Sequence, residues 1–186
     1  THPLNEIQLR RFNDVLLHFS SQPNLLIHSA NSAAFEHLEG SYFSMVRLGI
    51  SSFEPIVSIK SRVLYLKEVK AGEGISYGAT YVTKIDTKIA TVCMGYADGI
   101  PRSFKGFVLI RGQKFPVVGR ICMDLLMVDI GPHSSVEKWD EVTFVGAQGN
   151  EKISIQEFAA YSGRITYESL CALGPRVQRV YQEDSN

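Results

Sequence analysis

Residues 107–130 read FVLIRGQKFPVVGRICMDLLMVDI, and this stretch decides the fold class of the second part of the chain. It predicts three short strands, over residues 107–110, 116–118 and 120–130, punctuated by glycine and proline. The pattern continues on both sides, with strands predicted over residues 56–69, 88–96, 141–146 and 176–181. One helix interrupts them, starting at the capping-box pair Ser154 and Glu157 and ending near Gly163. Many short strands separated by turns favour a small β-barrel or sandwich.

The first 55 residues have a different pattern, in which helices and strands alternate. A helix is predicted over residues 3–19, because Pro3 suits a first helical position and apolar residues recur on one face. A buried strand over residues 25–27 and a polar loop follow, and Asn31 or Ser32 caps a short helix that ends near Leu38. A second short strand covers residues 45–47. This order indicates a parallel sheet or a segment of an α/β barrel, so two regions are expected, 1–55 and 56–186.

The composition is that of an ordinary globular chain and excludes several classes of protein. The 186 residues carry 19 Lys and Arg against 19 Asp and Glu, so the net charge is zero. A nucleic-acid binder that relies on bulk positive charge is therefore not expected. No run approaches the roughly 18 apolar residues of a membrane span, and no secretory signal is visible. The chain starts at Thr1 without a Met, which suggests a fragment or a processed product.

The cysteines and histidines form no recognisable metal or disulfide pattern. Cys93, Cys122 and Cys171 are odd in number and far apart, so reduced thiols in a cytoplasmic protein are the simplest interpretation. The five histidines lack metal-ligand spacing, and no metal site is expected.

Four clusters contain residue types that carry chemistry. Asn31 and Ser32 follow a predicted strand, where a phosphate or an ordinary helix cap is expected. Arg47 ends a predicted strand, where barrel enzymes keep their active sites, although surface ion pairs are equally common. Tyr77 lies in a glycine-rich loop, and simple packing explains most such tyrosines. Cys122 has no evident base, so a bystander thiol is favoured over a nucleophile. Taken singly, each cluster leaves the structural explanation open.

Taken together and in order, these motifs resemble the alanine racemase family over nearly the whole chain. The residues that carry the resemblance are Thr1-His2, Asn31-Ser32-Ala33-Ala34, Val46-Arg47-Leu48-Gly49-Ile50, Ser76-Tyr77-Gly78-Ala79-Thr80-Tyr81, Gly95-Tyr96-Ala97-Asp98-Gly99, Val118-Gly119-Arg120-Ile121-Cys122-Met123-Asp124 and Tyr167-Glu168. The resemblance implies a fold of α/β plus β. Residues 1–55 would be the last segments of a (β/α)8 barrel that binds pyridoxal 5'-phosphate (PLP), and residues 56–186 a β-rich C-terminal domain built on a small β-barrel.

The resemblance also implies a reaction and its catalytic residues. The family interconverts L-alanine and D-alanine for peptidoglycan precursors, with PLP and one base on each face of Cα. One base is a lysine, and the other, by motif match Tyr77, comes from the partner subunit of a homodimer. A phenol is normally protonated at neutral pH and needs help to act as a base. His2 would hydrogen-bond the Tyr77 hydroxyl, and Arg47 would contact both His2 and the pyridine nitrogen of PLP.

The remaining binding roles follow from the same motif matches. The phosphate of PLP would be held by residues from several loops, namely Asn31, Ser32, Gly49, Ile50 and Tyr167. Met123 would offer its backbone N–H to the substrate carboxylate from the partner subunit. Tyr96 would narrow the substrate entrance, with Asp124 behind it.

The chain also departs from the family pattern. The PLP lysine and the arginine that contacts the substrate carboxylate belong to an upstream half and match nothing here, and His2 runs straight into Pro3 where the family has a longer loop. A serine or broad-specificity racemase and a catalytically inactive fragment that forms dimers therefore remain open. The segments around Tyr77 and Met123 argue against a basic amino-acid decarboxylase.

Overall fold

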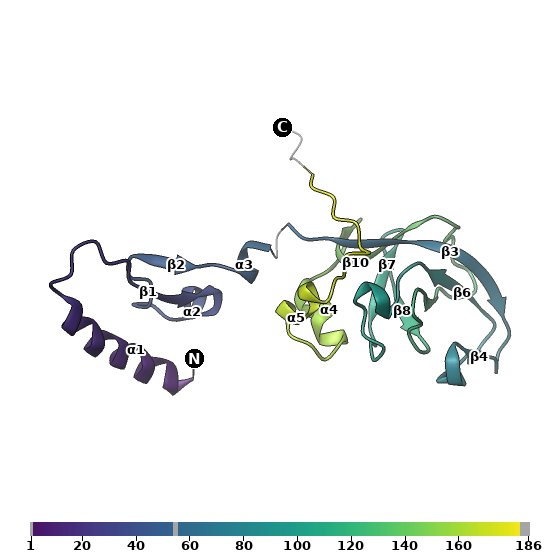
Figure 1. The fold of residues 1–186 in the computed structure, drawn as a ribbon. Coiled ribbons are helices and arrows are strands. Elements are labelled where there is room, and N and C mark those ends of the chain that lie inside the picture. The colour runs from purple at the N-terminus through teal and green to yellow at the C-terminus, as the bar shows by residue number, and fades with distance from the viewer. Residues whose placement is uncertain (1, 54–55, 183–186) are drawn as a thin grey trace. The chain divides into compact units, whose positions relative to one another are not determined.

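A computed structural model describes residues 2–53 and 56–182 (Figure 1). The chain divides into two compact units, Thr1–Ile56 and Val57–Asn186, called here the N-terminal unit and the C-terminal unit. Thr1 of the Thr-His motif lies outside the described residues, as does residue 55 at the expected domain boundary.

The N-terminal unit is a β/α segment. Its elements are α1 (Pro3–Leu16), a 3₁₀ turn (Leu17–Phe19), β1 (His28–Asn31), α2 (Ser32–His37), β2 (Met45–Arg47) and α3 (Ile50–Phe53). β1 and β2 pair in parallel, with His28 opposite Met45, and α2 lies between them along the chain. Parallel strands need such a crossover, so this arrangement agrees with the helix–strand alternation expected from the sequence.

Local capping explains where the helices of this unit begin. Pro3 occupies the first turn of α1, and Nδ1 of His2 accepts a hydrogen bond from the Leu4 N–H at 3.2 Å. At α2 the Asn31 side chain accepts from the Ala34 N–H at 3.0 Å. Both caps satisfy amide donors that the first helical turn leaves unpaired.

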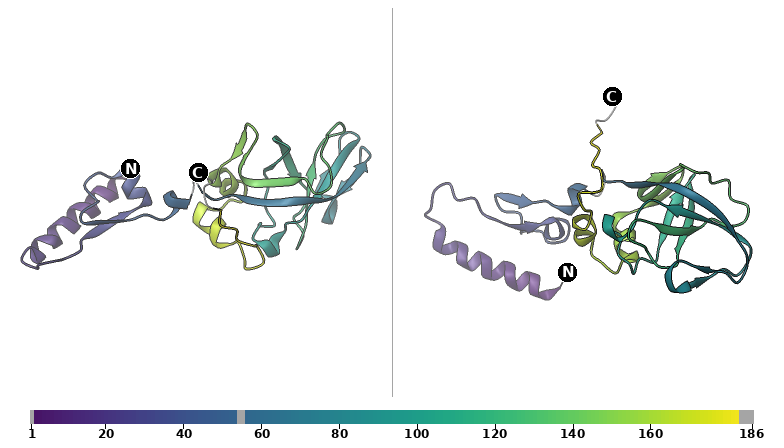
Figure 2. Two further views of the ribbon diagram at one scale, coloured as in Figure 1. Left: turned by 90° about the horizontal axis from the view of Figure 1, so that it is seen from above. Right: turned by 45° about the vertical axis from the view of Figure 1, so that its right-hand side comes forward.

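The helix α1 lies alongside the β1–β2 pair (Figure 2). The rings of Phe12 and Phe43 meet edge to face, with their centroids 5.4 Å apart. Many apolar side chains of this unit nevertheless stay exposed, including Leu17 at 72% and Leu26 at 71%. The unit therefore buries little apolar surface of its own.

The C-terminal unit is a closed antiparallel β-barrel of six strands. The barrel strands are β3 (Ile59–Val69), β6 (Thr87–Val92), β7 (Phe107–Ile110), β8 (Gln113–Val118), β9 (Leu126–Asp129) and β10 (Glu141–Gln148). Their order is β10-β3-β6-β9-β8-β7, and β7 pairs with β10 to close the ring. Strand β11 (Glu151–Ile153) extends β10, and β4 (Gly74–Ile75) and β5 (Tyr81–Val82) form a separate hairpin. The small barrel expected from the sequence is confirmed.

The barrel has a continuous apolar core. Phe104, Phe144 and Phe158 are its largest fully buried side chains, and burying one such ring contributes about 1.5–3 kcal/mol. Phe158 comes from α4 (Ile155–Tyr161), whose start is fixed by the capping box of Ser154 and Glu157. That helix was expected from the sequence. The next helix, α5 (Thr166–Cys171), was not.

Several predicted strands are wrong, misplaced or too long. The first strand is His28–Asn31 rather than residues 25–27, because Ala30 is the buried residue while Leu25 and Leu26 stay exposed. In the predicted strand 120–130, only Leu126–Asp129 pairs. Before it, the Cys122 N–H donates to the Leu125 carbonyl in a tight turn.

The third error is at the end of the chain. Residues 176–181 form no strand, because Arg176 is engaged in ion pairs with Asp98 and Asp124 in two distant loops. The predicted strand 88–96 also ends early, at Val92, and Tyr96 begins a 3₁₀ turn, Tyr96–Asp98.

Among the described residues, no helix has both the length and the apolar character needed to cross a membrane.

The β4–β5 hairpin is attached to the barrel through Asp129. One carboxylate oxygen of Asp129 accepts from the Tyr81 hydroxyl at 2.7 Å, and the other from the Thr87 hydroxyl at 2.6 Å. The hydrogen bond to Asp129, together with burial and the carboxylate charge, raises the pKa of Tyr81 to about 12.

This shift predicts an alkaline limit to stability. The fold favours the protonated phenol, so its contribution is complete below about pH 10, where an unfolded tyrosine titrates, and is lost as the pH rises towards 12. The free energy of unfolding can be measured with denaturant at a series of pH values across this window. It should fall less steeply with rising pH in Tyr81→Phe than in the parent protein. Tyr65→Phe, at an exposed position of β3, is the control. An unchanged slope in Tyr81→Phe would contradict the assignment.

Candidate functional site

Tyr77 begins the 3₁₀ turn Tyr77–Ala79 that connects β4 to β5. Buried Ile75 anchors the turn to a small cluster beside the barrel, whereas the Tyr77 side chain is 68% exposed. The Ser76 hydroxyl donates to the carbonyl of Arg120 at 2.6 Å. The turn that carries Tyr77 is thus fixed at its base while the phenol points outward.

Tyr96 lies on a second loop, and this loop pairs by its backbone with the loop of the Cys-Met-Asp motif. The N–H of Tyr96 donates to the Cys122 carbonyl and the N–H of Ala97 to the Met123 carbonyl, both at 3.0 Å. Gly95 makes this approach possible, because a Cβ there would lie 2.3 Å from the Met123 carbonyl oxygen. The structure therefore brings the Tyr96 motif and the Cys-Met-Asp motif into direct contact.

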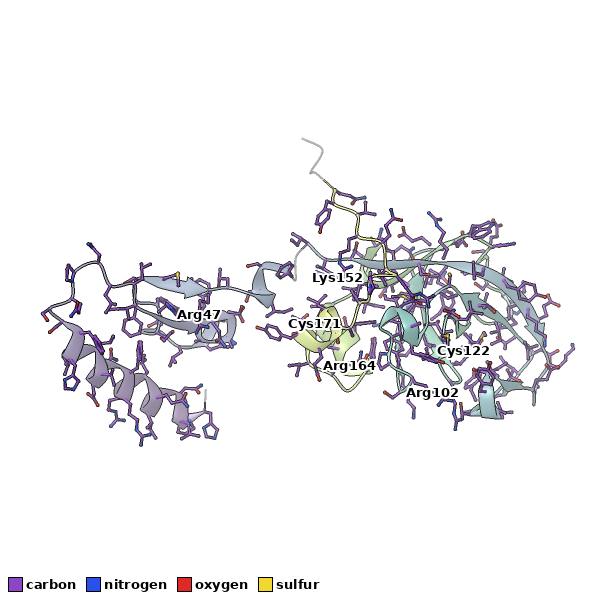
Figure 3. All side chains as sticks on the ribbon, viewed as in Figure 1. Arg47, Arg102, Cys122, Lys152, Arg164 and Cys171 are labelled. Atoms are coloured by element: carbon purple, nitrogen blue, oxygen red, sulfur yellow. The ribbon has the colours of Figure 1, made fainter. Side chains whose placement is uncertain are left out.

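A pocket of about 380 Å³ opens between these loops. It is lined by Tyr77, Tyr96, Arg102, Ile121 and Cys122. Figure 3 labels two of them, Arg102 and Cys122, on the C-terminal unit. Two phenol hydroxyls and one guanidinium around an open pocket suit a small anionic or zwitterionic ligand.

Asp124 is held by a residue from beyond α5. Arg176 donates to Asp124 at 2.7 Å and lies 3.3 Å from Asp98, which in turn accepts from the Gly95 N–H at 2.9 Å. The pKa of Arg176 is raised, first by its hydrogen bond to Asp124 and then by the charge of Asp98. Arg176 thus ties together the loops of Tyr96 and Met123.

Met123 is 53% exposed. Among residues 2–53 and 56–182, no hydrogen bond from its backbone N–H is found. This amide is therefore free to donate to a ligand.

A second group of predicted site residues meets in the N-terminal unit. The hydroxyl of Ser32, which is only 2% exposed, accepts from the Gly49 N–H at 2.8 Å. Ser32 follows β1 and Gly49 follows β2, so the loops after two parallel strands lie together. Asn31 caps α2 beside Ser32, and Ile50 begins α3 next to Gly49. A hydroxyl and backbone amides at the carboxyl ends of parallel strands are suited to a phosphate.

The other predicted residues have local partners. Arg47 donates to the Ser29 carbonyl at 2.9 Å, and His2 caps α1 through Nδ1. No hydrogen bond joins Arg47 to His2 within the part of the chain that the structure describes. Tyr167 lies on α5 in the C-terminal unit and is 46% exposed.

The sequence prediction did not include Arg102, Arg176 or Ser76 among the site residues. Arg102 lies just after the Tyr96 motif, which ends at Gly99. This closeness in sequence was the signal that could have placed Arg102 at the site. Arg176 is 52 positions from Asp124, so only the tertiary structure pairs them.

The comparison with known families settles the relationship. A family model described as "Alanine racemase, C-terminal domain" matches residues 56–181. The chain belongs to the alanine racemase family. The resemblance drawn from the motifs is therefore confirmed, together with the fold class that it implied.

Curated relatives and solved structures of the alanine racemase family agree. Alanine racemase of Halothermothrix orenii is 43% identical over 83% of this chain and 45% of that protein. The structure of alanine racemase from Streptomyces lavendulae matches with a TM-score of 0.88 and 33% identity, over 98% of this chain and 53% of that chain. That of Bacillus anthracis, with bound L-Ala-P, matches with a TM-score of 0.80 and 36% identity, over 95% and 49%. The chain thus spans about half the length of these relatives.

The close approach at Gly95 generates a test. Gly95→Ala should destabilise the C-terminal unit by about 1–3 kcal/mol, because the added methyl group would collide with the backbone of Met123. The matched control is Gly174→Ala, where a Cβ would lie an ordinary 3.7 Å from its nearest neighbour, the Ala97 carbonyl oxygen. Denaturant unfolding measures both variants, and equal stabilities would show that the two loops are not in contact.

Proposed function

We propose that this chain is part of a PLP-dependent racemase that interconverts L-alanine and D-alanine in the cytoplasm and supplies D-alanine for peptidoglycan precursors. The observation that carries the proposal is the pocket that Tyr77 and Tyr96 share beside the Cys-Met-Asp loop. The membership of the chain in the alanine racemase family supports it.

The residues of the N-terminal unit fit the phosphate of PLP. The buried Ser32 hydroxyl accepts from the Gly49 amide, so a hydroxyl and a backbone N–H lie together at the ends of two parallel strands. Ser32, Asn31, Gly49 and Ile50 would hold the phosphate, together with Tyr167. Arg47 uses one of its five N–H donors on Ser29 and keeps others for the pyridine nitrogen. When bound, PLP withdraws electrons from the amino acid and makes its Cα proton removable.

Inversion at Cα then needs a proton removed from one face and another delivered to the opposite face. Tyr77 Oη would exchange the proton on one face, and a lysine from the upstream half would serve the other. His2 Nδ1 accepts from Leu4 in α1, so Nε2 is the nitrogen left to hydrogen-bond the Tyr77 hydroxyl. This contact would orient the phenol and help it to lose and regain its proton.

Substrate binding would use the neighbouring loop. The free Met123 N–H would donate to the alanine carboxylate, and the Tyr96 ring would narrow the entrance. Excluding each additional methylene group by size contributes about 1–3 kcal/mol of discrimination, so a narrow entrance favours alanine over larger amino acids. Asp124 would act behind them by holding Arg176.

A homodimer would complete the site. Tyr77 and Met123 belong to the C-terminal unit, whereas Ser32, Gly49 and Arg47 belong to the N-terminal unit. In the proposed assembly the Tyr77 and Met123 of one subunit serve the active site of its partner.

Replacement of the proposed base tests the mechanism. In the full-length protein, Tyr77→Phe should lower racemisation by a factor on the order of 10²–10⁴, because the base on one face is lost. The other base still works, so one enantiomer should continue to exchange its Cα deuterium with solvent. Proton NMR of each enantiomer measures this, with Tyr65→Phe as control. Racemisation retained in both directions would remove Tyr77 from the mechanism.

Replacement of the buried serine tests the phosphate site. Ser32→Ala should weaken PLP binding by about 10-fold or more, because a hydrogen bond to a charged group is lost. Titration of the full-length apoprotein with PLP gives the Kd. Ser41→Ala is the control, since this equally buried hydroxyl donates to the Leu38 carbonyl. Equal Kd values for the two variants would place the phosphate elsewhere.

A further inference from the structure

The residue before Tyr77 has a backbone conformation that non-glycine residues rarely adopt. Ser76 has φ 64° and ψ −175°, a region that is essentially restricted to glycine. Ala79, in the same turn, also has a positive φ of 44°, so two non-glycine residues of this turn are strained. Such strain persists only where the surrounding contacts hold it.

Two contacts of the Ser76 side chain hold this turn. Its hydroxyl donates to the Arg120 carbonyl at 2.6 Å, a short bond across 44 positions of sequence. The same oxygen lies 3.6 Å from Sγ of Cys122, which lines the pocket with Tyr77. The side chain of Ser76 therefore connects the Tyr77 turn to the loop of Cys122, which also lines the pocket.

Gly119 leaves the space that this connection needs. A Cβ at Gly119 would lie 2.8 Å from the Ile75 carbonyl oxygen and 2.9 Å from Cβ of Ser76. Gly119 also has φ 72°, so glycine is favoured there for conformation as well as for space. Ile75 precedes Ser76, and Val118 precedes Gly119. Both are buried in one apolar cluster, which fixes the two backbone segments together.

We infer that Ser76, seated against Gly119, is a positioning residue that sets the placement of the Tyr77 phenol for proton transfer. The inference rests on the proposed function, in which Tyr77 is one of the two bases. Ser76 itself would touch no reacting atom. It acts by fixing the direction in which the chain enters Tyr77.

A purely structural role for Ser76 would predict a different result. A hydroxyl that only stabilises the hairpin would change the stability of the protein and leave the proton transfers alone. A positioning role predicts slower proton transfer at the Tyr77 face, because misplacing a catalytic group by about 1 Å costs on the order of 10²-fold.

The test compares variants of the full-length holoenzyme. Ser76→Ala keeps the strained backbone and removes the hydrogen bond, while Ser76→Gly removes both the bond and the strain. Both should lower kcat by about 10–100-fold with KM changed far less. With Cα-deuterated alanine, the primary isotope effect should rise for the enantiomer whose proton Tyr77 removes. Ser76→Gly relieves the strained conformation, so it decides the question if Ser76→Ala does not fold.

A second pair of variants, at Gly119 and at a control glycine, tests the space beside Ser76. Gly119→Ala should reproduce the kinetic effect of Ser76→Ala. Gly131→Ala is the matched control, because Gly131 has φ 75° and nothing within 4 Å of a built Cβ. It should leave kcat unchanged. Hydrogen exchange adds a readout independent of turnover: the Ala79 amide, bonded to the Ser76 carbonyl at 3.2 Å, should exchange faster in the Ser76 variants.

The outcomes separate this inference from the proposed function. Racemisation retained by Tyr77→Phe would overturn the proposed function and this inference with it. If Tyr77→Phe abolishes racemisation but both Ser76 variants keep the parent kcat and isotope effects, the inference alone is overturned. An equal loss of kcat in Gly119→Ala and Gly131→Ala would likewise overturn it, since backbone strain would then explain the effect without contact to Ser76.

Discussion

The pairing of β7 with β10 is the interaction on which the C-terminal unit depends. Val142 lies opposite Ile110 and Thr143 opposite Leu109, and these register pairs join the two ends of the six-strand ring. All four residues are fully buried. Closure removes the exposed edges that an open sheet would leave and encloses the apolar core. The loops that carry Tyr77, Tyr96 and Met123 are attached to this rigid frame.

Close backbone approach builds the candidate site within this frame. The loops of Tyr96 and Met123 meet through main-chain hydrogen bonds, and the turn of Tyr77 meets the Arg120 loop through one serine hydroxyl. Gly95 and Gly119 permit these approaches because a Cβ at either position would lie within 3 Å of a neighbouring carbonyl oxygen. The placement of the tyrosines therefore depends on residues that carry no chemistry themselves.

The site residues expected from the sequence fall into two groups in different units. Ser32 and Gly49 meet in the N-terminal unit, and Tyr77 and Tyr96 share a pocket in the C-terminal unit. The N-terminal unit leaves much apolar surface exposed, and the chain spans about half the length of its alanine racemase relatives. In the proposed assembly these two groups serve one active site from different subunits.

Features that depend on neighbouring residues could be predicted from the sequence. The capping box of Ser154 and Glu157, the Asn31 cap and the short strands around the turns are local, and the order of the motifs identified the family. Residues 120–125 and 176–181 were predicted as strands because their apolar content is strand-like. Their actual conformations depend on contacts with Tyr96, Asp98 and Ser76, which lie far away along the chain. The sequence could not predict these contacts, because ion pairs and close backbone approaches between distant segments leave no periodic pattern in it.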